Sequence, residues 1–164
     1  IPTTVFRFFT VYGPWGRPDM ALFKFAKAMR AGEPIDIYNH GNMKRDFTYV
    51  GDLVEAISKL SRVPPLEKIT PSELDSKSEI APWRIVNIGN SSAVKLMDFI
   101  EALEVELSVQ AKKNYLGMQQ GDVEATWADT ELLHKLTGFV PNTPVSEGIA
   151  QFTKWFTNYY SKGD

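Results

Sequence analysis

The residue with the clearest chemical potential is Arg17, within the stretch FRFFTVYGPWGRPDMA that runs from Phe6 to Ala21. The stretch opens like a buried strand, breaks at a Gly/Pro turn, and continues directly into a helix-like run. Open α/β folds bind ligands at such a junction. Arg17 offers a planar fork of donors to an anion, and the backbone N–H groups of Met20 and Ala21 could face a phosphate. A plain turn with a solvated arginine is the alternative.

A second cation, Arg45, lies in the stretch MKRDFTYV, just after a predicted turn. Its guanidinium suits it to neutralise a diphosphate group. A surface charge cluster of Lys44, Arg45 and Asp46 would explain the same residues without any ligand. Both interpretations stay open on the pattern alone.

These two motifs, in this order, resemble the C-terminal part of the extended short-chain dehydrogenase/reductase family, the NAD-dependent nucleotide-sugar epimerases and dehydratases. Within that family the chain is most similar to the UDP-glucuronate 4-epimerases, to about Tyr160. The resemblance implies an α/β fold in which residues 1–164 form the C-terminal substrate-binding portion, with the last strands and helices of a Rossmann-like nucleotide-binding domain. We expect the N-terminal NAD-binding portion upstream of Ile1, since the chain lacks an initiating Met and opens apolar.

The resemblance assigns roles around the sugar and its diphosphate. Thr10 and Arg17 match positions that hold the sugar carboxylate, a pair that would favour a uronic acid over a hexose. Arg45 matches an arginine that binds the UDP phosphates. These roles remain expectations that the resemblance carries.

Further positions match contacts to the nucleotide. Asp36 and Tyr38 match residues whose backbone contacts the uracil. Asp122 matches an aspartate that binds the ribose, although a simple Gly-Asp turn is the alternative. Gln119 stands where family members often carry an arginine, which leaves one cation fewer for the diphosphate.

The catalytic Tyr-x-x-x-Lys pair of this family is absent from the chain. None of the six tyrosines is followed four residues later by Lys, and Gly13 and Gly16 do not complete a dinucleotide-binding fingerprint. We therefore expect no catalytic residue here and no activity from the chain alone. NAD would act in the full-length enzyme, with Phe8 and Val11 near the nicotinamide ring.

The resemblance implies an isomerase that interconverts UDP-glucuronate and UDP-galacturonate by NAD-dependent oxidation and reduction at C4. It also implies a homodimer formed through the missing half. A decarboxylase or dehydratase on the same scaffold is one alternative, since a decarboxylase needs the same carboxylate. A stand-alone, non-catalytic nucleotide-sugar binding module is another, but the apolar start would leave it an exposed strand edge.

Composition excludes several other classes of protein. The net charge of −2, from 18 basic and 20 acidic residues, shows no excess that would favour nucleic acid or an anionic membrane. The absence of cysteine excludes disulfides and thiol catalysis and suits a cytoplasmic location. The histidines, His40 and His134, are too far apart in sequence to favour a metal site, and no apolar run reaches the roughly 18 to 20 residues of a membrane span.

Periodicity and turn residues predict the elements that position these side chains. Strands are expected at 3–11, 35–38, 44–50, 84–89 and 112–118. Helices are expected at 21–30, 53–60, 92–107, 129–138 and 143–159, with Asp52, Ser92 and Thr143 as N-caps. A long loop is expected over 63–83.

Overall fold

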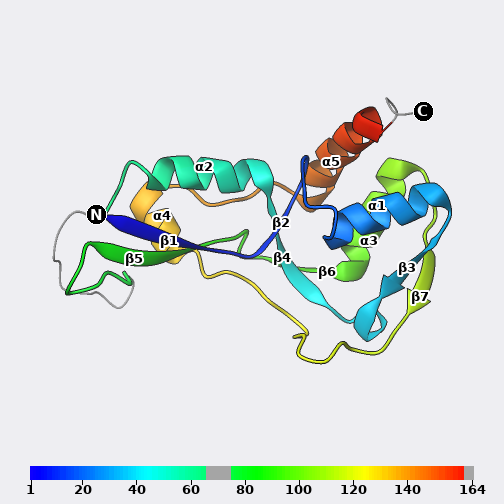
Figure 1. Cartoon of the computed structure of the whole chain (residues 1–164), viewed down its shortest axis with the longest axis horizontal. Coiled ribbons are helices and arrows are strands. Elements are labelled where there is room, and N and C mark those ends of the chain that lie inside the picture. The colour runs from blue at the N-terminus through cyan, green and yellow to red at the C-terminus, as the bar shows by residue number, and fades with distance from the viewer. Residues whose placement is uncertain (66–74, 161–164) are drawn as a thin grey trace. The chain divides into compact units, whose positions relative to one another are not determined.

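The computed structural model describes residues 1–65 and 75–160 (Figure 1). Its helices are α1 (Ala21–Ala31), α2 (Val50–Leu60), α3 (Leu96–Leu107), α4 (Glu131–Thr137) and α5 (Val145–Tyr160), with a short 3-10 turn η1 (Tyr38–Gly41). Its strands are β1 (Thr3–Phe8), β2 (Thr10–Tyr12), β3 (Pro34–Ile37), β4 (Lys44–Tyr49), β5 (Trp83–Ile88), β6 (Ala93–Lys95) and β7 (Lys112–Tyr115).

The chain divides into two compact units. The first unit comprises Ile1–Val11, Asp46–Ser92 and Trp127–Asn142. The second comprises Tyr12–Arg45, Ala93–Thr126 and Thr143–Asp164. Both contain helices and a parallel strand pair, so the predicted α/β class is confirmed.

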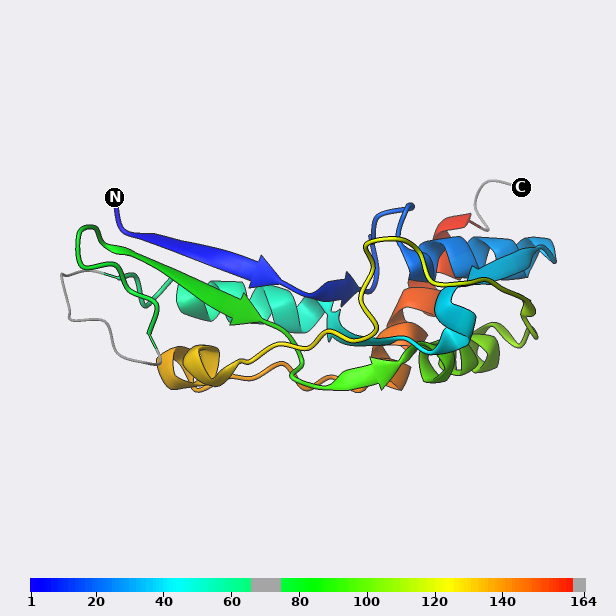
Figure 2. The same cartoon turned by 90° about the horizontal axis from the view of Figure 1, so that it is seen from below.

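The first unit is built on the parallel pair of β1 and β5, which run side by side in both views (Figures 1 and 2). The register runs from Thr3 opposite Trp83 to Phe8 opposite Ile88. Alternate strand residues point to opposite faces of the pair. The residues on one of these faces pack against α2 and α4. The buried core on that side consists of Leu53, Ala56, Leu60, Val86, Ile88 and Leu133.

The second unit combines the parallel pair of β3 and β7 with α1, α3 and α5. Aromatic rings fill much of its interior: Phe23 meets Phe156 edge-on with ring centroids 5.4 Å apart. Tyr12 packs against Phe99 at 5.7 Å. A glycine is needed at 148 on α5, since a Cβ there would lie 2.2 Å from the Tyr12 hydroxyl. The remaining strands form a short sheet in the order β2-β4-β6.

Most predicted elements are present, with shifted ends. The strand expected over 3–11 is split at Phe9 into β1 and β2, and β7 ends at Tyr115 rather than 118. Gly32 ends α1 in the left-handed conformation, with φ of 69°, as a C-cap glycine does. Of the loop expected over 63–83, residues 66–74 lie outside the described residues, and Trp83 already belongs to β5.

The N-caps predicted at Asp52 and Ser92 are wrong, and the one predicted at Thr143 stays a prediction. Helix α2 begins at Val50, so Asp52 lies inside its first turn, and its Oδ2 accepts the backbone N–H of Asn142 at 3.0 Å. Helix α3 begins at Leu96, because residues after Ser92 first form β6. Helix α5 begins at Val145, with the N–H of Gly148 donating to the carbonyl of Pro144.

Candidate functional site

The loop that joins β2 to α1 presents Arg17 to solvent. Its backbone requires unusual conformations, with φ of 133° at Gly13 and 61° at Trp15. The N–H of Met20 donates to the carbonyl of Arg17 at 3.1 Å and closes a turn across Pro18. The Arg17 side chain is 76% exposed, so its guanidinium is accessible to a ligand.

Arg17 is paired within its own turn. Its Nε donates to Oδ1 of Asp19 at 3.1 Å and its Nη2 to Oδ2 at 2.5 Å. The hydrogen bond from Arg17 holds the pKa of the Asp19 carboxyl below its ordinary value. The guanidinium predicted to bind an anion is therefore already paired with the carboxylate of Asp19.

Trp15 fixes this loop to helix α5. Its ring centroid lies 5.3 Å from that of Trp155 and 5.4 Å from that of Tyr159. A non-glycine residue in the left-handed region is held only where its surroundings over-determine it. Here the two rings of α5 provide that support, although Trp15 is still 73% exposed.

The N-terminus of α1 lies directly after Arg17. Met20 and Ala21 are exposed, and the first turn contains no acidic side chain. Unpaired N–H groups of a first helical turn attract anions. The N–H of Met20 is engaged by Arg17 in this state, so a phosphate would have to compete with that turn for it.

Arg45 and Asp122, predicted independently, lie together in the second unit. Nη2 of Arg45 donates to Oδ1 of Asp122 at 2.7 Å, and Nη1 donates to the carbonyls of Lys44 and Glu124 at 2.9 and 3.3 Å. The side chains are 18% and 35% exposed. Arg45 thus fastens the segment that follows β7 while one side of the pair still meets solvent.

Gln119 belongs to the same segment. Its carbonyl accepts the N–H of Asp122 at 3.2 Å, and Gly121 supplies the positive φ of 83° that this turn requires. The Gly-Asp turn foreseen as the alternative role of Asp122 is therefore present, and it delivers the carboxylate to Arg45. The turn positions the Asp122 carboxylate, and its contact with a ribose stays a prediction.

Asp36 and Tyr38 lie at the end of β3 and the start of η1. Asp36 is exposed and its Oδ1 accepts the side-chain amide of Asn114 at 2.7 Å. Tyr38 is half-buried. Their predicted roles use the backbone, and the side-chain contacts neither require nor oppose them.

Phe8, Thr10 and Val11 belong to the first unit. Phe8 is 47% exposed at the carboxyl end of β1 and stacks on Phe6 with centroids 6.1 Å apart. Val11 packs against the core of α2, α4 and β5. Thr10 is half-buried, and because Arg17 belongs to the second unit, their action on one carboxylate stays a prediction.

Sequence reasoning missed Asp46, which is completely buried in the first unit. Its carboxylate accepts the backbone N–H groups of Asn90, Ser91 and Ala128 at 2.7, 3.0 and 2.9 Å. The hydroxyl of Thr48 adds a fourth hydrogen bond at 3.0 Å. Asp46 therefore holds the loop at the carboxyl end of β5, the end at which parallel sheets bind ligands. The surface charge cluster considered for this residue is excluded.

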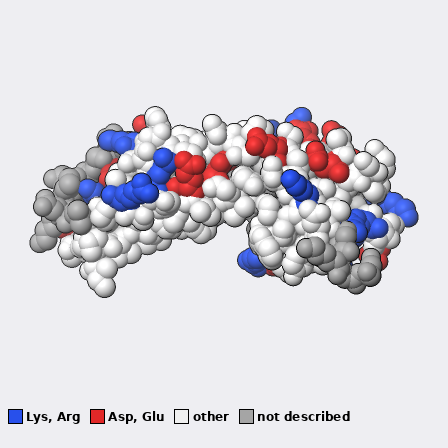
Figure 3. Space-filling view, turned by 90° about the horizontal axis from the view of Figure 1, so that it is seen from above, with Lys and Arg blue, Asp and Glu red and all other residues white. Residues whose placement is uncertain are grey.

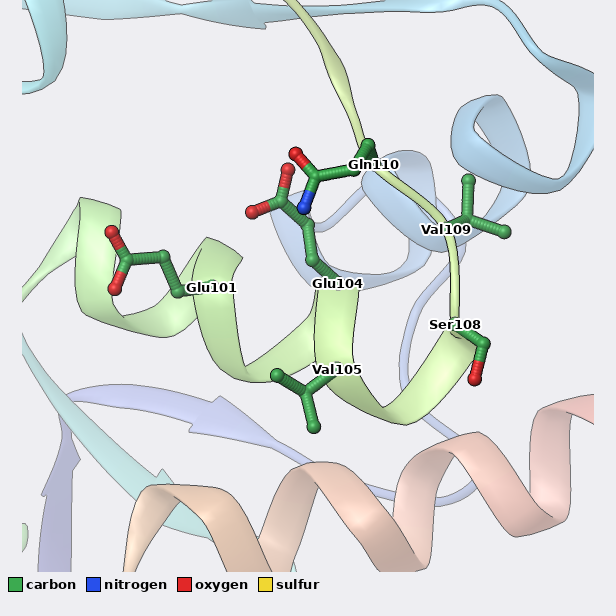
Figure 4. A pocket seen from close by; sticks show the side chains of 6 residues that line it. All are labelled: Glu101, Glu104, Val105, Ser108, Val109 and Gln110. Atoms are coloured by element: carbon green, nitrogen blue, oxygen red, sulfur yellow. The ribbon is translucent and has the colours of Figure 1, made fainter.

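A separate surface hollow lies along α3 and the segment after it (Figure 4). It is lined by Glu101, Glu104, Val105, Ser108, Val109 and Gln110. It contains none of the predicted site residues. The Glu104 carboxylate is already bound by Lys113 Nζ at 2.5 Å and the N–H of Ala111 at 2.8 Å.

Charged side chains of both signs are interspersed on the face shown in Figure 3.

Among residues 1–65 and 75–160, no group of three or more His, Asp or Glu side chains is placed to hold a metal ion. Over the same ranges, no helix has both the length and the apolar character that crossing a bilayer demands.

Comparison with known proteins extends the resemblance carried by the two motifs. Residues 1–68 match the NAD dependent epimerase/dehydratase family. The chain is 53% identical over 165 residues to a probable UDP-glucuronate 4-epimerase of Rhizobium meliloti, covering 99% of this chain and 48% of that protein. It is 43% identical over 162 residues to UDP-glucuronate 4-epimerase 4 of Arabidopsis thaliana, covering 96% of this chain and 36% of that one.

A solved structure shows the same arrangement of elements. The UDP-glucuronic acid 4-epimerase of Bacillus cereus, in complex with UDP-glucuronic acid and NAD, superposes with a TM-score of 0.80 at 30% identity. The match covers 98% of this chain and 46% of that structure. The resemblance and the Rossmann-like α/β fold are thus confirmed, and the chain spans about half the length, or less, of the relatives it matches.

Proposed function

We propose that this chain, which is similar over nearly its whole length to UDP-glucuronate 4-epimerases, is the C-terminal half of such an enzyme. The full-length enzyme would interconvert UDP-glucuronate and UDP-galacturonate. The observation that carries the proposal is the extent of the similarity, 53% identity over 99% of the chain. The guanidinium of Arg17 is accessible and can bind the carboxylate that distinguishes a uronic acid from a hexose.

In this proposal NAD, when bound, would supply the hydride acceptor and donor chemistry that epimerisation at C4 of the sugar requires. The chain's own residues bind and orient. Phe8, exposed at the carboxyl end of β1, suits a contact with a flat aromatic ring, and Asp46 keeps the neighbouring loop in place. The chain holds no Tyr-x-x-x-Lys pair, so the proton of the 4-hydroxyl would be handled by the other half.

The second unit would bind the nucleotide sugar. Arg45 with the turn from Gln119 to Asp122 would meet the diphosphate and the ribose, and the N-terminus of α1 adds further donors. Arg17 would take the sugar carboxylate. The backbone of Asp36 and Tyr38 would contact the uracil. The cytoplasm is the proposed location, and the proposed dimer forms through the other half.

The test is to express the complete polypeptide that contains this chain and to incubate it with UDP-glucuronate and NAD. The predicted product is UDP-galacturonate at unchanged mass, identified by chromatography and proton NMR. Loss of carbon dioxide with formation of a UDP-pentose would replace the proposal by a decarboxylase on the same scaffold. Binding of UDP-sugar without any product would replace it by a binding module.

A further inference from the structure

Arg17 and Asp19 form a closed pair whose geometry is set within one turn. Pro18 stands between them, and the hydrogen bond from Met20 N–H to the carbonyl of Arg17 closes the turn at 3.1 Å. This brings the Asp19 carboxylate alongside the guanidinium, with Nε to Oδ1 at 3.1 Å and Nη2 to Oδ2 at 2.5 Å. Two parallel N–H···O bonds are the geometry that an arginine makes with a bound carboxylate.

The pair therefore places one carboxylate where the proposed function requires another. A uronic acid that uses the Nε and Nη2 edge must displace Asp19. A uronic acid that uses the opposite edge of Arg17 would lie beside the negative charge of Asp19, which repels it. In both cases the charge of Asp19 opposes binding of the carboxylate.

The contact is also easy to open. The two side chains are 76% and 56% exposed, and a solvent-exposed ion pair contributes little free energy. Lys24, in the first turn of α1, also attracts the Asp19 carboxylate, so a displaced Asp19 has a second cation nearby. A carboxylate ligand can thus replace Asp19, whereas a neutral sugar leaves the pair intact.

We infer that Asp19 is an internal competitor for the carboxylate-binding guanidinium of Arg17 and lowers the preference of the site for uronic acids. This inference rests on the proposed function of Arg17. Asp19 does not touch the substrate and acts through Arg17. Removing its charge should strengthen binding of UDP-glucuronate and leave binding of UDP-glucose unchanged.

The experiment is calorimetric titration of the complete polypeptide with UDP-glucuronate and, separately, with UDP-glucose. For Asp19→Asn the Kd for UDP-glucuronate is expected to fall about two- to five-fold, the range that exposed ion pairs span, while the Kd for UDP-glucose stays constant. Glu106→Gln removes the same charge from an exposed position on α3 of the same unit and should change neither constant. Asp19→Glu keeps the charge and should bind both ligands like the wild type.

Three outcomes overturn the inference. An unchanged Kd for UDP-glucuronate in Asp19→Asn does so directly. Equal changes for both ligands would show that Asp19 only shapes the turn, and a gain in Asp19→Glu would show that charge is irrelevant. Arg17→Met separates the two proposals: if it leaves UDP-glucuronate binding unchanged, the proposed role of Arg17 fails, and if it weakens that binding while Asp19→Asn has no effect, only the present inference fails.

Discussion

At the scale of single residues, Asp46 shows how a charged side chain can be a structural centre. It is fully buried and satisfied by three backbone N–H groups and one hydroxyl. Gly89 lies so close that a Cβ there would be 2.8 Å from Oδ2 of Asp46. The carboxylate therefore connects β4, the end of β5 and the segment before α4.

Asp46→Asn should destabilise the chain strongly. One amide NH₂ would then face N–H donors that now share the carboxylate, and hydrogen bonds to a charged group are each worth about 1.5 to 3 kcal/mol. We expect a loss of about 3 kcal/mol in the free energy of unfolding, measured by urea denaturation. Glu55→Gln, at an exposed position on α2, should cost under about 0.5 kcal/mol. A loss for Asp46→Asn no larger than that of the control would contradict the hydrogen-bond network.

Substitutions of Trp15 test the backbone strain in the loop between β2 and α1. With φ of 61°, any residue with a Cβ is disfavoured, while glycine is not. We expect Trp15→Gly to be more stable than Trp15→Ala by about 1 kcal/mol, since both variants lose the same ring contacts. At Lys27, exposed within α1, the order should reverse, because glycine weakens a helix. Equal stability of the two Trp15 variants would argue against the left-handed conformation.

At the scale of elements, the sequence predicts where the helices and strands lie better than it predicts their first and last residues. The 3.6-residue pattern placed α1 and α5, and glycines at 32 and 138 mark the ends of α1 and α4 in the left-handed conformation. The predicted cap at Asp52 is wrong because α2 begins at Val50, and the Asp52 carboxylate accepts the backbone N–H of Asn142, a residue 90 positions away. Contacts of that range leave no trace in a local pattern.

In the candidate site, too, local sequence patterns predict some features, and only the folded structure shows the others. Arg17 was predicted at a turn before a helix, and the structure places it there, exposed to solvent. Arg45 and Asp122 were predicted separately, and only the fold shows them 2.7 Å apart. Asp46 was missed because aspartate is rarely buried, and hydropathy gave no reason to place it inside.

The link between α3 and β7 predicts a pH dependence of stability. Burial raises the pKa of Glu104, but hydrogen bonds from Lys113 and the Ala111 N–H outweigh that effect and leave the pKa below its ordinary value of 4.5. A carboxyl whose pKa is lowered on folding stabilises the protein above its unfolded pKa and loses that contribution as the pH falls through the folded value.

Glu104→Gln removes this contribution. The difference in unfolding free energy between wild type and variant should be largest above about pH 4.5 and should shrink on acidification below it. Glu101→Gln, on the same helix and exposed, should show no such trend. A difference that grows as the pH falls would contradict the assigned pKa direction.

At the scale of the whole molecule, the β1–β5 pair of the first unit has one covered face. Phe6 points to the core, so Val5 points to the other face, where it is 39% exposed. We expect the other half of the proposed enzyme to cover this face. The 164-residue chain by itself would expose it and associate.

Val5→Lys should therefore act in opposite directions in the two forms. It should reduce self-association of the 164-residue chain, measured by light scattering, because a charge on an open strand opposes pairing. In the complete polypeptide it should lower the Tm, because the charge would be buried. Val54→Lys, at a position on α2 that is 59% exposed, should affect neither. A complete polypeptide that tolerates both changes equally would show that this face stays open.

We propose that this chain recognises the sugar carboxylate of a uronic acid epimerase through Arg17. The most direct measurement is the ratio of kcat/KM for UDP-glucuronate to that for UDP-glucose, in the complete wild-type polypeptide and in Arg17→Met. We expect the ratio to fall about 10- to 100-fold in Arg17→Met, the value of a lost charged hydrogen bond, and to stay unchanged in Arg62→Met. An unchanged ratio in Arg17→Met would contradict the proposed role of Arg17.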